Sequence, residues 1–473
     1  MTNPIWREGA ATTAARIAAG DLSASDAVGS ALDRIAEVNG PLNAIVDDQA
    51  DAARAAAEAL DNEFKANGPV GPLHGLPVTI KVNVDQAGSA TTNGIPALKD
   101  AMAKEDAPLV ANLKRAGAIV VGRTNTPEFS FRADTDNPLH GRTYNPWNKA
   151  ISPGGSSGGA SSAVMSGMCA LAHGNDIGGS LRFPAAQTGA ATVKPGLGRV
   201  PAFNPSQVEE RGMLAQSMSV QGIIARTVAD VRLGTKAMIA QDIRDPFMAP
   251  VPWEGAPIDG PIKVAFTKEM FDFDLHPAVS AALDDAAAAL RDAGYEVVEV
   301  EPPHLRDMGL DGYRTLMGEV QELMGPMIRS NGSDTLKGIF DVYYQMFPPY
   351  EGAELLKMMA KRTFYAREWA KCLAKYPLFL TPFLPNPPFA ANRDAEGWDG
   401  VKEVLGGALY SYSMNYIGQP AGNIAAGMQD GLPLNVQIVG RRWREDLILD
   451  ACEAVETRVG VMADKLFERG LDV

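Results

Sequence analysis

The chain has 473 residues and a formal net charge of −14, with 46% hydrophobic and 21% charged residues. This composition is typical of a globular protein with a large core, and the acidic excess argues against nucleic acid or an anionic membrane as the main partner. Glycine is the exception, because 47 residues are about 10% of the chain against a usual level of roughly 7%. These glycines belong either to flexible linkers or to a site.

No targeting segment is visible in the sequence. Residues 1–28 contain acidic residues and lack the apolar stretch of a signal peptide, and no 18 uncharged apolar residues follow one another. We therefore expect a soluble, cytoplasmic protein. The cysteines Cys169, Cys372 and Cys452 are far apart and lack Cys-x-x-Cys spacing, so neither a disulfide framework nor a zinc site is predicted.

Predicted helices and strands alternate along the chain. Ser23 and Asp26 form a capping box at the start of an amphipathic helix. The other predicted elements, in chain order, are a helix over 51–60, a strand over 78–84, helix–strand pairs over 109–121 and 278–300, a strand over 434–438 and a helix after Glu445. Such alternation favours an α/β sheet with helices packed on it.

Two regions stand apart from this alternation. Residues 305–360 hold seven of the 19 methionines and several aromatic residues. This content predicts a helical core, with a lid or pocket wall for bulky apolar substrates as the alternative. Residues 377–389 are rich in proline and predict a rigid loop.

Residues 152–198 contain 11 glycines and seven serines, a composition that a flexible linker would also have. This segment has only three charged residues, however, and apolar residues occur throughout it. A linker has no use for that apolar content. We therefore predict a buried segment whose glycines serve backbone geometry.

Within this segment, residues 176–180 read Asp-Ile-Gly-Gly-Ser. Adjacent glycines let successive backbone N–H groups converge, as an oxyanion hole requires. Ser180 beside them could attack a carbonyl, but it needs a base. None of the five histidines stands in a recognisable triad order, whereas Lys81 lies among apolar neighbours in a predicted strand and is a candidate for a lowered pKa. Serines of residues 154–159 could bridge the two.

A competing pattern overlaps these serines. Residues 155–159 also read as G-x-S-x-G, the nucleophile elbow, with Ser157 as the attacking group. That pattern requires an acid and then a histidine later in the chain, and no histidine follows His304. The sequence therefore disfavours this alternative.

The residues resemble those of the amidase signature hydrolases. The family motif looks like Gly-Gly-Ser-Ser-Gly-Gly, then Asp-x-Gly-Gly-Ser-x-Arg-x-Pro-Ala, then Lys-Pro and Gly-Arg, with a lysine segment upstream. The matching segments of this chain are residues 71–81, 124–129, 145–148, 152–159, 176–185, 194–195, 198–199, 418–420 and 431–433.

The resemblance implies an α/β fold with a large, mixed, mostly parallel twisted sheet covered by helices on both faces. It implies a single amidase domain over residues 1–473. The signature core would comprise about residues 65–200 and 410–450, and a variable lid or substrate region would comprise about residues 305–400.

The resemblance also implies a Ser-cisSer-Lys site. Ser180 would be the nucleophile, Ser156 the bridging serine in a cis peptide, and Lys81 the base. No metal ion or organic cofactor is implied. The remaining implied residues are the oxyanion-hole amides of Ile177, Gly178, Gly179 and Ser180, and the supporting residues Ser157, Asp176 and Arg182.

Two positions depart from the family pattern. Val82 follows Lys81 where the family often has Asp, and Asn175 precedes Asp176 where Thr is common. The first departure leaves open how the lysine is oriented and tuned. Arg182 also has two interpretations, a ligand for a substrate carboxylate or a structural salt bridge.

The sequence thus predicts a stand-alone amidase for hydrophobic or aryl amides, with carbamates (urethanes) and esters as related substrates. Its partner would be a small-molecule amide or carbamate, with no nucleic acid and no membrane, and a homodimer is left open. Activity should rise with pH through the apparent pKa of the lysine relay. The alternatives are a glutaminase subunit of a tRNA-dependent amidotransferase and a binding protein that has lost catalysis on the amidase scaffold.

Overall fold

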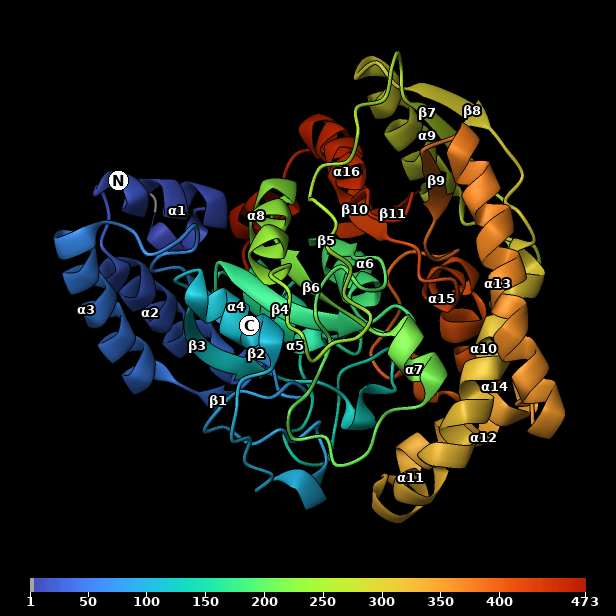
Figure 1. Cartoon of the computed structure of the whole chain (residues 1–473), viewed down its shortest axis with the longest axis horizontal. Coiled ribbons are helices and arrows are strands. Elements are labelled where there is room, and N and C mark those ends of the chain that lie inside the picture. The colour runs from blue at the N-terminus through green and yellow to red at the C-terminus, as the bar shows by residue number, and fades with distance from the viewer. Residues whose placement is uncertain (1–3) are drawn as a thin grey trace.

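A single sheet runs through the computed structural model, which describes residues 4–473 (Figure 1). Its 11 strands come from the whole length of the chain. In spatial order they are β1 (Ile45–Asp48), β3 (Ile119–Thr124), β2 (Pro77–Lys81), β4 (Leu171–Asp176), β6 (Val220–Ala225), β5 (Ala191–Lys194), β10 (Ala421–Gln429), β11 (Leu432–Gly440), β9 (Leu378–Pro382), β7 (Lys263–Phe266) and β8 (Glu296–Glu299).

The sheet is mixed, as expected, but the expectation of a mostly parallel sheet is wrong. Among the described strands, β3–β2–β4 and β9–β7–β8 pair in parallel, and the other six of the ten pairings are antiparallel. The longest pairing shows why. β10 and β11 are separated by only Asp430 and Gly431, and so short a turn joins antiparallel strands alone.

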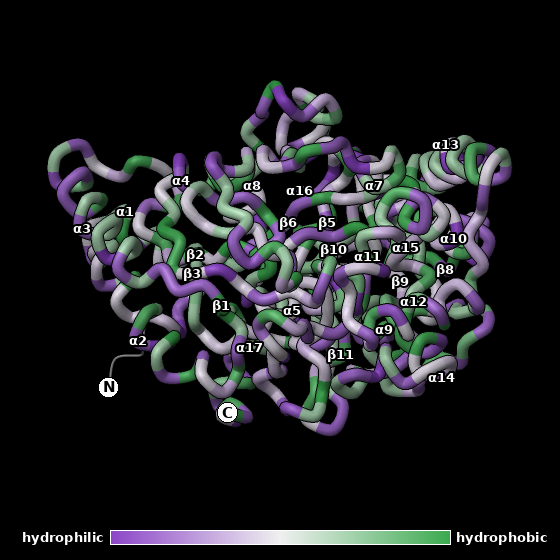
Figure 2. Tube along the Cα trace, turned by 90° about the horizontal axis from the view of Figure 1, so that it is seen from below, coloured by the Kyte–Doolittle hydropathy of each residue, from purple (hydrophilic) through white to green (hydrophobic). Residues whose placement is uncertain are grey.

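Helices cover both faces of the sheet, as expected. Figure 2 shows α4 and α8 on one side of the strands and α2 and α17 on the other. The helices are α1 (Ala10–Ala19), α2 (Ala24–Leu42), α3 (Ala50–Asn67), α4 (Pro108–Arg115), α5 (Gly158–Met165), α6 (Arg182–Thr188), α7 (Met213–Met218), α8 (Val228–Met238), α9 (Pro277–Asp292), α10 (Leu305–Leu323), α11 (Gly325–Asn331), α12 (Asp334–Met346), α13 (Gly352–Lys375), α14 (Gly397–Val401), α15 (Leu409–Tyr416), α16 (Glu445–Val459) and α17 (Met462–Arg469).

The period of the strands distributes their side chains between these two layers. Val120 of β3 packs in the core that α4, α8, α9 and α16 share, whereas its neighbours Ile119 and Val121 pack in the core beneath α2, α5 and α17. β9 alternates in the same way, with Leu380 in the first core and Phe379 in a third core formed with α10 to α15. A strand covered on both faces reads as a continuous apolar run.

The predicted local elements are confirmed with small shifts at their ends. α2 begins at the predicted capping residue, because Ser23 Oγ accepts the Asp26 N–H at 2.9 Å. The predicted strand over 78–84 is β2 and ends three residues earlier, at Lys81. The two helix–strand pairs are α4 with β3 and α9 with β8, and each helix is followed by a glycine at positive φ, Gly117 at +94° and Gly294 at +89°.

The prediction of a loop over 377–389 is wrong for its first half. Residues Leu378–Pro382 form β9, which is buried between β11 and β7. Four residues, the first three of them apolar, separate the prolines at 377 and 382, and this run is long enough to make a short strand. The proline bias concealed it because Pro382 stands at the end of the strand, where a missing N–H is tolerated.

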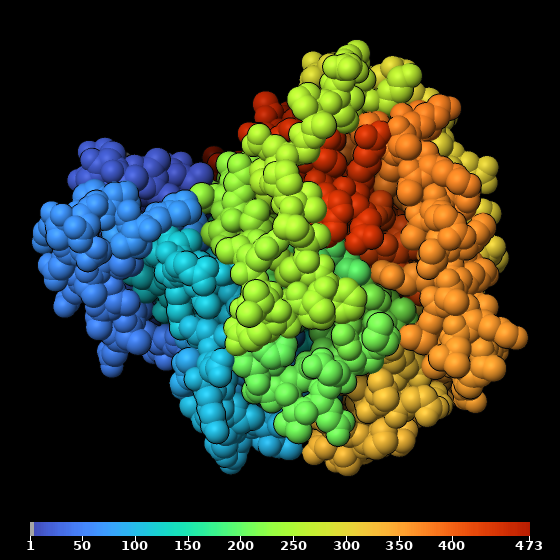
Figure 3. Space-filling model, in the orientation of Figure 1, coloured from blue at the N-terminus to red at the C-terminus, as the bar shows by residue number. Residues whose placement is uncertain are grey.

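The methionine-rich and aromatic residues 305–360 are mainly helical, as predicted, and form α10, α11, α12 and the start of α13. In Figure 3 the yellow and orange surface of residues 300–380 borders the green surface near residue 210. Glu319 of α10 makes this connection, since its carboxylate accepts the N–H groups of Leu214 and Ala215 in α7. Of the helices in residues 4–473, none has the length and apolar character needed to cross a membrane.

Candidate active site

Lys81 is the last residue of β2 and is fully buried. Its Nζ lies 2.7 Å from Ser156 Oγ, 3.1 Å from Ser157 Oγ and 2.9 Å from Asn175 Oδ1. Burial lowers the pKa of Lys81 well below its ordinary value, and the charge of Asp176 only partly opposes this effect. The structure therefore brings the predicted base and bridging serine together and favours the neutral amine.

The two serines stand on a tightly packed glycine turn before α5. The peptide bond between Gly155 and Ser156 is cis, as the resemblance implied. A Cβ on Gly155 would lie 2.3 Å from the Arg132 main-chain oxygen, so only glycine fits there. The Ser157 N–H donates to the main-chain oxygen of Ser180 at 3.2 Å and ties the two serine segments together.

Ser180 lies just before α6 and is partly exposed. It shares a pocket with Gly155, the residue before Ser156. Its hydroxyl makes no hydrogen bond to another residue of 4–473, so the link from Ser156 to Ser180 rests on their placement alone.

Three of the four expected oxyanion-hole amides are free. The N–H groups of Ile177, Gly178 and Ser180 have no acceptor among the described residues. The Gly179 N–H donates to Asp176 Oδ1 at 2.7 Å. We therefore revise the expected oxyanion hole to Ile177, Gly178 and Ser180.

Asp176 and Arg182 form a buried ion pair behind this turn. Arg182 Nε lies 3.0 Å from Asp176 Oδ2, and both side chains have no exposed surface. Burial alone would raise the pKa of Asp176, but the charge and hydrogen bonds of Arg182 lower it to about 2. The guanidinium also donates to Gln437 and to the main-chain oxygen of Ser411, which leaves Arg182 no free group for a substrate carboxylate. The structural interpretation of Arg182 is the one the geometry supports.

Asn175 was marked by the sequence only as a departure from the family pattern. In the structure it contacts the lysine amine directly and also pairs with Asn83, because its Nδ2 donates to Asn83 Oδ1 at 2.9 Å. Val82, the other departure, is buried and belongs to none of these contacts. Because Asn175 replaces one polar residue, threonine, by another, the sequence contained no further indication of its contact with the lysine.

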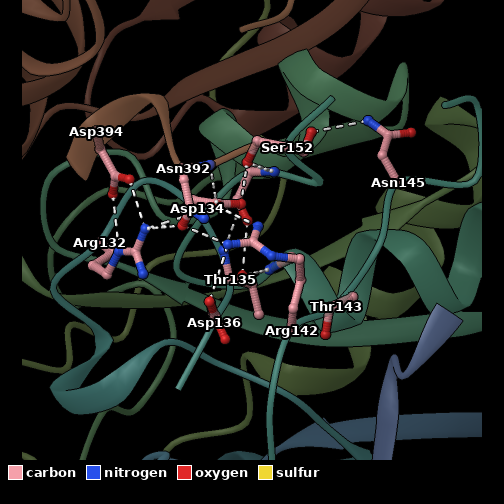
Figure 4. A network of polar contacts seen from close by, with 12 residues as sticks. Arg132, Asp134, Thr135, Asp136, Arg142, Thr143, Asn145, Ser152, Asn392 and Asp394 are labelled. Carbon is pink, nitrogen blue, oxygen red and sulfur yellow. Dashed lines mark hydrogen bonds and ion pairs between the residues drawn. The ribbon is translucent and has the colours of Figure 1, made fainter. Parts of the chain in front are cut away.

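A second polar network holds the serine segment in place (Figure 4). Asp134 is fully buried and accepts the Ser152 hydroxyl at 2.6 Å, and its other oxygen accepts Arg142 at 2.6 Å. Thr135 donates to the main-chain oxygen of Gly154 at 2.8 Å. These bonds fix the chain just before Ser156 in the glycine turn.

The same network reaches a distant part of the chain. Arg132 Nη2 donates to Asp394 Oδ1 at 2.8 Å, across 262 residues of sequence, and the Asn392 N–H donates to Asp134 at 2.8 Å. Arg132 also lines the pocket beside Ser180. The loop after β9 is thus held against the catalytic segment by buried charges, and sequence spacing alone contains no trace of it.

The pocket that contains Ser180 holds about 500 Å³ of space, part of it open to solvent. The lining residue with a charge is Arg132, whose guanidinium is taken by Asp394. The apolar and aromatic lining residues are Phe131, Ala133, Ile177, Phe183, Tyr313, Leu316, Met317, Phe340, Tyr343, Leu405 and Tyr412. Five of these residues lie on α10 and α12, so the region predicted as helical core also supplies a pocket wall.

Among the histidines, His173 is buried in β4. Its Nε2 lies 2.9 Å from Gln221, and burial lowers its pKa to about 3. Residues 4–473 hold no group of three or more His, Cys, Asp or Glu side chains arranged to bind a metal ion.

The Lys-Pro and Gly-Arg segments lie behind the site and contact α16. Arg199 Nε lies 3.2 Å from Glu445 of α16, and Glu445 accepts the Gly196 N–H at 2.9 Å. Lys194 is buried nearby, and burial lowers its pKa to about 7. Its Nζ donates to the Pro195 main-chain oxygen, a structural contact.

Comparison with known proteins settles the family. The family model described as Amidase matches residues 26–449. The chain belongs to the amidase family. This amidase is 44% identical to an indoleacetamide hydrolase of Bradyrhizobium diazoefficiens over 98% of its own length and 89% of that protein's. It is therefore an amide-hydrolysing enzyme.

Two further relatives mark the breadth of the amidase signature. The amidase is 30% identical to a glutamyl-tRNA(Gln) amidotransferase subunit of a Synechococcus species, over 97% of each chain. It superposes on the solved structure of a bacterial aryl acylamidase of the amidase signature family with a TM-score of 0.84 and 26% identity, over 98% and 99% of the two chains. The expected fold is thereby confirmed.

The structural interpretation of Arg182 makes a testable prediction. Arg182→Ala leaves the buried carboxylate of Asp176 without its counter-charge, which should lower the free energy of unfolding by about 3–5 kcal/mol. Urea unfolding followed by circular dichroism measures this change. The control is Arg306→Ala, which removes an exposed ion pair with Asp272 and should leave the unfolding midpoint almost unchanged. Equal stability of Arg182→Ala and wild type would contradict the interpretation.

Proposed function

We propose that this amidase hydrolyses amides with a hydrophobic or aryl acyl group, indoleacetamide among them, through an acyl-enzyme on Ser180. The observation that carries the proposal is the pocket, in which Ser180 and the free amides of Ile177 and Gly178 face a wall of aromatic and apolar side chains. Such a wall gains free energy from burying an aryl group. The 44% identity to an indoleacetamide hydrolase supports the same substrate class.

In the proposed mechanism, neutral Lys81 accepts the proton of the Ser156 hydroxyl while Ser156 accepts that of Ser180. Ser180 Oγ attacks the carbonyl carbon, and the negative oxygen is bound by the amides of Ile177, Gly178 and Ser180. The relay then runs in reverse, and Ser156 protonates the departing nitrogen as the C–N bond breaks. Water attacks the acyl-enzyme by the same path and releases the carboxylic acid. No metal or organic cofactor enters these steps.

The proposal extends to aryl carbamates and esters, because these compounds present the same carbonyl carbon to Ser180. It treats residues 1–473 as one domain, which the continuous sheet from β1 to β8 supports. The region of about 305–400 then acts as the substrate region, since α10 and α12 contribute pocket side chains.

A glutaminase function is the alternative suggested by the 30% identity to an amidotransferase component. Free glutamine carries an ammonium and a carboxylate, which need counter-charges when they are buried. The pocket offers Arg132 alone among its lining residues, and Arg132 is already paired with Asp394. The pocket therefore favours an uncharged aryl amide over glutamine.

The decisive experiment is a hydrolysis panel on the purified chain. It comprises indoleacetamide, an anilide, an aryl carbamate, an aryl ester, an aliphatic amide and glutamine. We expect the aryl amides to have the highest kcat/KM. Glutamine hydrolysis that appears only with a partner protein would favour the amidotransferase alternative, and no turnover together with no labelling of Ser180 by a fluorophosphonate would favour a binding protein.

The nucleophile makes the first prediction from this mechanism. Ser180→Ala should lower kcat for every substrate by about 10⁴-fold or more, because the attacking oxygen is removed while the fold is kept. Lys81→Ala should cause a loss of similar size. Ser330→Ala, an exposed serine of α11 that bonds only to its own helix, is the control and should keep wild-type kcat. Full activity of Ser180→Ala would overturn the mechanism.

The proposed role of Lys81 as the base predicts how kcat/KM depends on pH. Only the neutral amine of Lys81 accepts a proton, so kcat/KM should rise with pH through the pKa of the relay. Because burial lowers that pKa, the rise should level off well below the value of about 10.4 of a free lysine. Initial rates with indoleacetamide between pH 5 and pH 11 measure the limb. A plateau reached only above pH 10 would contradict the assignment of Lys81.

A further inference from the structure

The three neighbours of the Lys81 amine differ in whether they accept a hydrogen bond from it or donate one to it. Asn175 Oδ1, at 2.9 Å, is only an acceptor. Ser157 Oγ, at 3.1 Å, donates its own proton to the Asn175 main-chain oxygen at 3.4 Å, so it presents a lone pair to the lysine. A neutral amine has two N–H groups and one lone pair. When Asn175 and Ser157 take the two N–H groups, the lone pair is left for the Ser156 hydroxyl at 2.7 Å.

The orientation of Asn175 is set by a chain of donors. Its Nδ2 donates to Asn83 Oδ1 at 2.9 Å, and Asn83 Nδ2 donates to Ser130 Oγ at 2.9 Å. Ser130 Oγ in turn donates to Asn93 Oδ1 at 2.7 Å. If the Asn175 amide were flipped, its NH₂ group would face the lysine amine. Its Oδ1 would then face Asn83 Oδ1, and two carbonyl oxygens would repel each other. Ser130, a member of this chain of donors, lines the pocket that contains Ser180.

We propose that Asn175 and Asn83 are positioning residues that hold the Lys81 amine with its lone pair directed at Ser156. The inference rests on the proposed role of Lys81 as the base. A neutral amide suits this task better than a carboxylate would. A carboxylate at the same distance would stabilise the ammonium form, which has no lone pair to offer.

Other charged groups lie on the elements around the amine. On β4, the pKa of Asp176 is lowered to about 2 by Arg182 despite its burial, and burial lowers that of His173 to about 3. On β3, Arg123 donates to main-chain oxygens, and burial lowers its pKa to about 10. On α2, Arg34 is paired with Glu37, and α5 carries no charged residue. On β5, burial lowers the pKa of Lys194 to about 7, so a limb between pH 5 and pH 10 is assigned to Lys81 by its response to a substitution at Asn175.

The first test uses the rate at which a fluorophosphonate labels Ser180, measured against pH. This reaction needs the nucleophile and its base but no amide substrate. Asn175→Asp should move the acid limb upward by one pH unit or more, because the new carboxylate holds the proton on Lys81. Asn331→Asp adds the same charge at an exposed site on α11 and should leave the limb at its wild-type position. An unmoved limb in Asn175→Asp would overturn the inference.

The second test separates positioning from folding. Asn175→Leu and Asn83→Ala should lower kcat for indoleacetamide by about 10- to 100-fold with little change in KM, because the base is misdirected while the pocket is intact. Asn204→Ala is the control, because Asn204 donates to the main-chain oxygen of Asn83 and not to its side-chain amide. Wild-type kcat in Asn83→Ala would refute its positioning role, and unfolding curves identify a variant that fails for want of stability.

The two tests also separate this inference from the proposed function. If wild type is labelled at Ser180 but hydrolyses none of the amides, the substrate proposal fails and the labelling rates still decide the role of Asn175. If Ser180→Ala is as active as wild type, the base assignment fails, and the inference fails with it.

Discussion

The burial of one lysine amine governs the arrangement of this site. Lys81 ends a strand that lies between two parallel neighbours and beneath helices on both faces, so its ammonium form would lose nearly all hydration. Desolvation favours the neutral amine, which is the form that accepts a proton. The groups that touch Nζ are neutral oxygens of two serines and one asparagine. A buried lysine surrounded in this way suits the proposed role of a base.

The negative charge of Asp176 opposes the neutral form of Lys81, and Arg182 compensates that charge. Its carboxylate acts to raise the pKa of Lys81, yet Arg182 lies against it and compensates its charge. The same carboxylate accepts the Gly179 and Leu181 N–H groups and so shapes the turn before Ser180. One ion pair therefore both shields the proposed base from an unpaired negative charge and sets which amides are left for the proposed oxyanion. Both effects would be lost with Arg182.

Local parts of this structure were predictable from sequence because they depend on near neighbours. The capping box at Ser23, the strand that ends at Lys81 and the glycine turn at 178–179 follow from rules of short range. The resemblance to a family added the catalytic roles. The bond between Arg132 and Asp394 joins residues 262 positions apart, and no spacing rule reaches that far. β9 was hidden for a related reason, since its burial depends on partners elsewhere in the chain. Asn83 gave no signal and Asn175 stood out only as a departure from the family pattern, because an asparagine pair has no characteristic pattern.

The turn beside Ser180 and the aromatic wall of the pocket are in direct contact because residue 178 is glycine. A Cβ on Gly178 would lie 2.7 Å from the Tyr412 ring, so the ring can pack against the turn at residues 178–179 only because residue 178 is glycine. Tyr313 of α10 packs on Tyr412, with ring centroids 4.5 Å apart. The aromatic wall is thus stacked outward from the point where the carbonyl oxygen would bind. An acyl group whose carbonyl sits at Gly178 meets aromatic rings immediately beyond it, which is the geometry that an arylacetamide, with one methylene between carbonyl and ring, would satisfy.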